Sequence, residues 1–145
     1  MPATAPADSR LPTGTVTILF TDLEGSTALW EQYPAAMQPA LARHDRLLRH
    51  AIESFGGCIV KSTGDGVLAV FARAPNALAA CLAAQRDLQA AAAGVSSAAT
   101  AVSAARIPIS LRVRMGLHTG AAELRDRDYF GTAPNRAARF NDPPK

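Results

Sequence analysis

The segment TVTILFTDLEGST (residues 15–27) decides the fold of this chain. Its first six residues are β-branched or apolar, which is typical of a buried strand. The polar residues 21–27 that follow predict a turn that opens a helix carrying Leu29 and Trp30. Asp22 is therefore expected just past the end of the predicted strand.

The rest of the chain predicts strand pairs separated by helices. Pro34 breaks the first helix, and Gly56 ends the second one. Strands are predicted at residues 58–62, 67–71, 111–118 and 120–124, and further helices at 40–54, 74–93 and 135–140. The order β-α-α-β-β-α-β-β-α predicts an α+β fold, a ferredoxin-like antiparallel sheet with helices packed on one face.

The length of 145 residues suits one domain. Residues 1–13 are rich in Pro, Ala and Thr and are expected to be a disordered tail. Residues 14–145 are expected to form the domain, with residues 94–107, an Ala/Ser/Val-rich stretch, as a flexible surface loop.

Charge and hydropathy exclude several classes of function. The net charge is +3 with the basic residues scattered, so no nucleic-acid partner is expected. Arg43, Arg46 and Arg49 are interpreted as the solvated face of a helix. No apolar run reaches the roughly 20 residues of a membrane span, and the N-terminal residues are not expected to be a signal peptide. Cys58 and Cys81 are expected to be buried reduced thiols, which indicates a cytoplasmic protein.

Asp22 and Asp65 are the candidate metal ligands. Asp65 lies in the turn of the predicted hairpin, and in a ferredoxin-like sheet the first strand lies beside that hairpin. Two divalent ions about 3.5–4 Å apart need shared hard oxygen ligands of this kind. The alternative is that both are ordinary turn residues, because aspartate is common in turns.

The turn Glu24–Thr27 is a candidate phosphate-binding element. A turn of small residues that opens a helix presents backbone N–H groups to an anion. Here the anion would lie next to the candidate metal ligand, as phosphoryl chemistry requires. Alternatively, Ser26 and Thr27 serve only as helix caps.

Four motifs then occur in order: FTDLEGST (20–27), KSTGDG (61–66), RVRMGLHTG (112–120), and DYFG (128–131) with NRAAR (135–139). Together they resemble the class III adenylate/guanylate cyclase catalytic domain of the bacterial type, from about residue 15 to residue 140. The resemblance implies further elements after the NRAAR helix. We therefore expect this chain to hold a C-terminally incomplete domain.

The resemblance also implies roles for individual residues. Asp22, Asp65 and the Leu23 carbonyl would hold two Mg²⁺ or Mn²⁺ ions. Glu24, Gly25, Ser26 and Thr27 would bind the triphosphate. Lys61 and Asp128 would read adenine, since a donor and an acceptor suit its N1 and N6. Asn135 would orient the ribose, and Arg139 would stabilise charge on the α-phosphate.

The implied function is an adenylate cyclase that converts ATP to 3′,5′-cyclic AMP in signal transduction. Its sites would be shared across a homodimer, as a two-fold interface allows. The first alternative is a catalytically silent nucleotide-binding or dimerisation module. A diguanylate cyclase is a weaker alternative, because the hairpin turn reads TGDG (63–66) rather than that family's acidic motif. His118 is interpreted as a structural strand residue.

Overall fold

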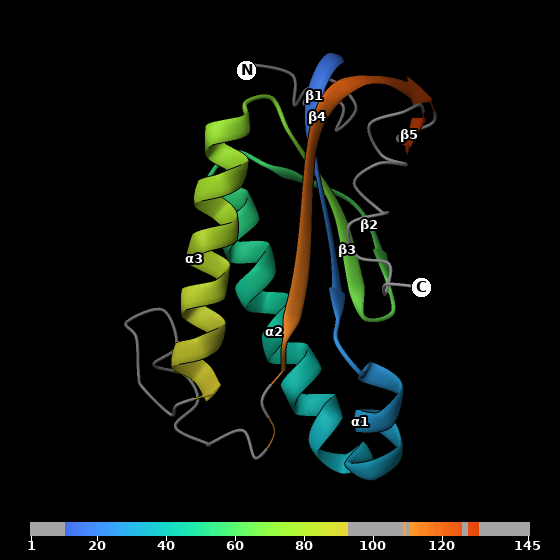
Figure 1. Ribbon diagram of the computed structural model, residues 1–145, viewed down its shortest axis with the longest axis vertical. Helices are drawn as coiled ribbons and strands as arrows, with labels where there is room; N and C mark the ends of the chain where they lie inside the picture. The colour runs from blue at the N-terminus through green and yellow to red at the C-terminus, as the bar shows by residue number, and fades with distance from the viewer. Residues whose placement is uncertain (1–10, 93–108, 110, 126–127, 131–145) are drawn as a thin grey trace, which may run out of the picture.

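The computed structural model describes residues 11–92, 109, 111–125 and 128–130 (Figure 1). The predicted loop at 94–107, the helix at 135–140 and most of the predicted tail lie outside these residues. The described elements are β1 (Gly14–Leu23), α1 (Ser26–Gln32), α2 (Pro34–Ser54), β2 (Cys58–Thr63), β3 (Gly66–Phe71), α3 (Ala74–Ala92), β4 (Val113–Arg125) and β5 (Asp128–Phe130).

The strands form an antiparallel sheet in the order β2-β3-β1-β4-β5. Helices α2 and α3 lie side by side on one face of this sheet, and α1 lies at the end of β1 (Figure 1). This arrangement confirms the predicted α+β fold with helices packed on one face. Within the described residues, no helix is long and apolar enough to cross a membrane.

Two predicted strand boundaries were wrong. β1 continues to Leu23, because every residue from Gly14 to Leu23 has a partner on β4. The predicted break before Gly120 is also absent. Gly120 pairs with Val16 and Ala122 pairs with Gly14, so β4 is one continuous strand. The second hairpin is instead formed by the last residues of β4, past those that pair with β1, and by β5, where Glu123 pairs with Phe130.

The main core lies between the sheet and the two long helices. Strand residues Leu19, Val67, Ala69 and Phe71 pack there with Leu48, Ala51 and Ile52 of α2 and with Ala77, Ala80, Cys81 and Ala84 of α3. The contact face of α3 therefore consists mainly of alanine, which lets the helix approach the sheet closely. Leu78 and Leu82 of the same helix are exposed.

Gly57, between α2 and β2, marks the closest backbone approach to this core. A Cβ atom at Gly57 would lie 2.5 Å from Phe71 Cε1 and 2.8 Å from Ile52 Cγ2. Both neighbours are fully buried. The position therefore requires a residue without a side chain.

The opposite face of the sheet carries a second apolar cluster. Alternate residues of a strand point to opposite faces. On β1, Val16, Ile18 and Phe20 accordingly lie opposite the helix-facing Leu19. Val16 and Ile18 are fully buried there with Leu68 and Val70 of β3, and Leu11, Val60, Ala122 and Leu124 pack against them. This second face is called the distal face below.

Candidate active site

Asp22 lies within β1, near its end, rather than beyond it as the sequence predicted. By the alternation of the strand it shares the distal face with Ile18 and Phe20. Its side chain is about 24% exposed, so it is held by neighbouring groups while one side stays open to solvent. A carboxylate in this setting is available to a ligand that approaches the distal face.

Asp65 lies in the two-residue turn between β2 and β3, and two hydrogen bonds fix that turn against β1 and α1. The Ser26 hydroxyl donates to Asp65 Oδ2 at 2.6 Å. The backbone N–H of Val67 donates to the Thr21 hydroxyl at 3.1 Å. The structure thereby brings the Asp65 turn to the β1–α1 junction, where Asp22 also lies. The sequence predicted this proximity but not the two bonds that produce it.

The backbone carbonyl of Leu23 is directed towards the Asp65 turn. Antiparallel strands alternate between hydrogen-bonded and non-hydrogen-bonded residue pairs. The Glu24 N–H donates to the Arg112 carbonyl at 2.8 Å, and Leu23 is paired with Val113. Leu23 therefore belongs to a non-hydrogen-bonded pair, and its carbonyl is directed away from β4, towards the side of β1 where the Asp65 turn lies.

Arg114 is a site residue that the sequence did not reveal. It lies directly opposite Asp22 on β4. Its Nε donates to Asp22 Oδ1 at 2.8 Å, and one terminal nitrogen donates to Oδ2 at 2.6 Å. The hydrogen bond to Asp22 raises the pKa of Arg114 above its usual value, and the charges of Asp22, Glu24 and Asp65 act in the same direction. The only available signal was the register of β1 and β4, which a single sequence does not show.

The turn before α1 is built around a left-handed residue. Gly25 has φ +66° and precedes the first helical residue, Ser26. No side chain caps the start of this helix, so the alternative that Ser26 is a cap is wrong. Its hydroxyl is committed to Asp65 instead. Glu24 and Thr27 are exposed at this turn, and triphosphate binding there stays a prediction.

Lys61 reaches the distal face because of a β-bulge. Ile59 pairs with Ala69 but Lys61 pairs with Leu68, so Val60 is the extra residue. Without this insertion Lys61 would share the helix-facing side with Ile59. With it, Lys61 lies on the side of Leu68, which is also the side of Asp22. Bulges that re-aim a side chain are frequent next to active sites.

The remaining predicted residues belong to the end of the chain. Asp128 opens β5, opposite Arg125 of β4. Figure 1 shows the end of β4 bending over so that β5 turns back towards the side of β2 in that view. Asn135 and Arg139 lie outside the described residues. His118 lies in β4 opposite Ile18, half-buried, and its structural role stays a prediction.

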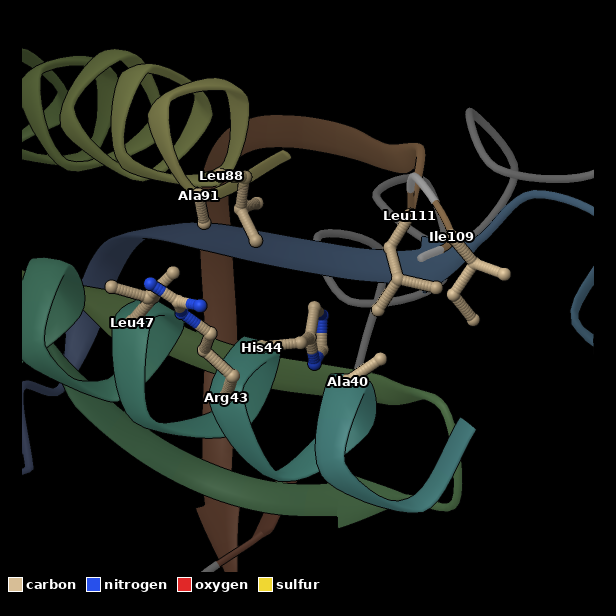
Figure 2. A pocket seen from close by; sticks show the side chains of 8 residues that line it. All are labelled: Ala40, Arg43, His44, Leu47, Leu88, Ala91, Ile109 and Leu111. Atoms are coloured by element: carbon tan, nitrogen blue, oxygen red, sulfur yellow. The ribbon is translucent and has the colours of Figure 1, made fainter. Parts of the chain in front are cut away.

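A small pocket lies elsewhere, between α2, the end of α3 and the segment before β4. Figure 2 shows Arg43 and His44 extending into it from α2. Arg43 is only 9% exposed, so its assignment to a solvated face was wrong. Arg46 and Arg49 are exposed, as predicted. Periodicity within α2 could not reveal that Arg43 lies in a pocket that the distant residues Ile109 and Leu111 also line.

Both cysteines are free thiols, as predicted, but only Cys81 is buried, and Cys58 is partly exposed. Burial raises its pKa from 9.0 to about 11, so this thiol is not a nucleophile at neutral pH. Within the described residues, no cluster of three or more His, Cys, Asp or Glu side chains could hold a metal ion. Asp22, Asp65 and the Leu23 carbonyl are nevertheless hard oxygen donors. They fit a magnesium-like ion that takes few protein ligands and keeps several waters or phosphate oxygens.

Known proteins resemble this chain in sequence and in fold. The sequence model of the adenylate and guanylate cyclase catalytic domain matches residues 9–143. An uncharacterized protein of Mycobacterium tuberculosis is 39% identical over 137 residues, 92% of this chain and 41% of that protein. An adenylate cyclase of Lachancea kluyveri is 35% identical, covering 90% of this chain and 8% of the fungal protein. The chain thus spans less than half the length of these relatives.

A solved structure of a monomeric adenylate cyclase from Trypanosoma brucei superposes with a TM-score of 0.72. It is 28% identical, and the match covers 92% of this chain and 71% of that chain.

Proposed function

Because this chain belongs to the adenylate and guanylate cyclase catalytic domain family, we propose that it converts ATP to 3′,5′-cyclic AMP and pyrophosphate. One observation carries the proposal. Asp22 and the turn of Asp65 meet at one end of the sheet, where Ser26 bonds Asp65 at 2.6 Å. Two carboxylates beside a turn that opens a helix suit a nucleoside triphosphate with its divalent ions.

Asp22, Asp65 and the Leu23 carbonyl would hold the divalent ions that this family generally uses. When bound, such ions lower the pKa of the ribose 3′-hydroxyl and neutralise the triphosphate. The 3′-oxygen then forms a bond to the α-phosphorus. The bond between the α-phosphorus and the oxygen that bridges to the β-phosphorus breaks, which releases pyrophosphate, and the hydroxyl proton passes to solvent. The side chains themselves position the reactants. Ser26 fixes Asp65, and the backbone N–H groups of Gly25, Ser26 and Thr27 would bind the phosphates, while the Glu24 N–H stays on the Arg112 carbonyl.

Lys61 and Asp128 are the residues that would select adenine. A lysine donates to the adenine N1, and an aspartate accepts from the N6 amino group. Guanine presents the opposite polarity at both places and would leave these groups unpaired. The β-bulge at Val60 supports this role, because it turns Lys61 to the face that carries Asp22. Asn135 would orient the ribose, and Arg139 would face the charge that develops on the α-phosphate.

The complete site would form between two copies of the chain. Asp22 and Lys61 both lie on the distal face, which α2 and α3 do not cover. In a two-fold dimer the carboxylates of one copy would meet Lys61, Asp128, Asn135 and Arg139 of the other. Two equivalent sites follow from the symmetry.

Turnover tests this function. Purified protein is incubated with ATP and Mn²⁺, and cyclic AMP is quantified by chromatography. We expect product from the wild type, and a loss of at least about 100-fold in Asp65→Asn, given the size of metal-ligand effects. Asp87→Asn is the matched control, because it makes the same chemical change on α3 and should keep full activity.

A folded wild type without product would refute the enzymatic proposal. If that protein still bound ATP in a Mn²⁺-dependent way, it would be the catalytically silent nucleotide-binding module instead. Equal loss in Asp65→Asn and Asp87→Asn would show that Asp65 has no special role.

A further inference from the structure

Arg114 holds the carboxylate of Asp22 by both oxygens. Nε bonds Oδ1 at 2.8 Å and a terminal nitrogen bonds Oδ2 at 2.6 Å, which is the bidentate geometry that makes arginine–carboxylate pairs strong and directional. Both oxygens of one candidate metal ligand are thus engaged by a cation that belongs to the protein. A metal ion that binds Asp22 therefore shares an oxygen that already accepts from this guanidinium, and the positive charge of Arg114 opposes its approach.

The surroundings explain why a cation stands there. Asp22 bonds Arg114 directly, and the charges of Glu24 and Asp65 also act on this guanidinium. Carboxylates gathered in this way repel one another unless a cation lies among them. Arg114 supplies part of that positive charge, and an excess of negative charge remains to attract a divalent ion.

From this geometry we infer that Arg114 competes with the divalent metal for Asp22 and sets the metal affinity of the site. The inference rests on the proposed function, because it takes Asp22 as a metal ligand. Arg114 is a positioning residue in this scheme. It keeps Asp22 oriented before the metal arrives, and its hydrogen bonds to Asp22 weaken when the metal binds.

The exposure of the pair makes such an exchange feasible. The side chain of Arg114 is 37% exposed and that of Asp22 is 24% exposed. A fully buried pair would resist opening, because each ion would lose its only partner in a medium that solvates it poorly. A partly solvated pair opens at small cost, because water replaces the broken hydrogen bonds. We therefore expect removal of Arg114 to tighten metal binding by a modest factor, about threefold to fivefold.

The test is the affinity for Mn²⁺ without nucleotide, measured by the electron paramagnetic resonance of free Mn²⁺. Arg114→Met keeps an unbranched stem that can replace the arginine methylenes and removes the guanidinium charge, and it should lower the dissociation constant. Arg112→Met is the matched control. It removes the same charge from the segment that leads into β4, two residues earlier and on an exposed side chain, and should change the constant little. Arg114→Lys keeps a charge but loses the bidentate fork, so it should fall between wild type and Arg114→Met.

A second readout follows Arg114 itself. Its Nε–H resonance, identified by its loss in Arg114→Met, should shift as Mg²⁺ is titrated into the wild type. Asp22→Asn should abolish both this shift and the tight Mn²⁺ binding. Circular dichroism of each variant verifies that the fold is kept.

The possible outcomes distinguish competition by Arg114 from the existence of the metal site. If Mn²⁺ binding depends on Asp22 but is the same in Arg114→Met, Arg112→Met and wild type, the competition is refuted and the metal site stands. Weaker binding in Arg114→Met also refutes competition. If binding is independent of Asp22, the metal site of the proposed function fails, and the inference fails with it.

Discussion

Replacing Ser26 with alanine removes the hydroxyl that donates to Asp65 Oδ2 at 2.6 Å. A hydrogen bond to a charged group contributes about 1.5–3 kcal/mol, and this one is only partly buried, so we take the lower end, about 1.5 kcal/mol. For a chain of this size that corresponds to a fall in Tm of roughly 3–6 °C. The Asp65 turn also loses one of the two bonds that place it at the end of β1.

The activity should fall together with the stability. Catalysis of this type depends on position to within a fraction of an ångström. If the Asp65 carboxylate adopts a second orientation for most of the time, kcat/KM of the variant falls about tenfold. This fall corresponds to a loss of about 1.4 kcal/mol of transition-state stabilisation. Cyclic AMP production from ATP and Mn²⁺ measures this loss, and urea unfolding followed by circular dichroism measures the stability.

Two comparisons make the experiment decisive. Thr27→Ala makes a similar change one position later on an exposed side chain. It keeps the backbone N–H that is assigned to the phosphates, so stability and activity should stay nearly unchanged. In an Asp65→Asn background, Ser26→Ala should cost much less than in the wild type, because the charged partner is gone. Equal effects of Ser26→Ala and Thr27→Ala, or full additivity with Asp65→Asn, would refute the role assigned to Ser26.

Three further predictions concern the core, a buried thiol and base selection. Gly57→Ala should lower the free energy of unfolding by about 1–3 kcal/mol in urea titrations, because its Cβ would meet Phe71 at 2.5 Å; an unchanged midpoint would contradict this packing. Burial raises the pKa of Cys81 to about 11. The unfolded chain therefore releases this proton near pH 9 while the folded chain keeps it. Stability should consequently fall between pH 9 and pH 11 by about 1–2 kcal/mol, and Cys81→Ala should remove that part of the pH dependence. Lys61→Met should reduce the preference for ATP over GTP in kcat/KM by about tenfold, whereas an unchanged ratio would exclude Lys61 from base recognition.

The sequence was sufficient to predict much of the fold. The apolar run before Asp22, the hairpin around Asp65 and the long helix after Phe71 each have a clear local pattern, and the structure has all three. The approach of Asp22 and Asp65 could also be predicted, because strand order in a ferredoxin-like sheet places the first strand beside the hairpin. These features depend on periodicity and turn chemistry, which are local properties of the chain.

Features that depend on pairing between distant segments could not be predicted from the sequence. The bond between Arg114 and Asp22 requires the register of β1 against β4, and the orientation of Lys61 requires one inserted residue at Val60. A shift of one residue turns every side chain of a strand to the other face, and no pattern in a single short strand reveals it. The predicted break before Gly120 was wrong for a similar reason, since the pairing of Gly120 with Val16 shows that β4 continues through this position.

The central claim is that Asp22 and Asp65 form one half of a cyclase site that a second copy of the chain completes. Mixing Asp65→Asn with Arg139→Ala protein tests it most directly. Each variant alone should be inactive, and random exchange of equal amounts should make half of the dimers mixed, with one intact site each. We therefore expect recovery of about one quarter of the wild-type rate of cyclic AMP formation. No recovery, with mixed dimers demonstrated by native mass spectrometry, would contradict the claim.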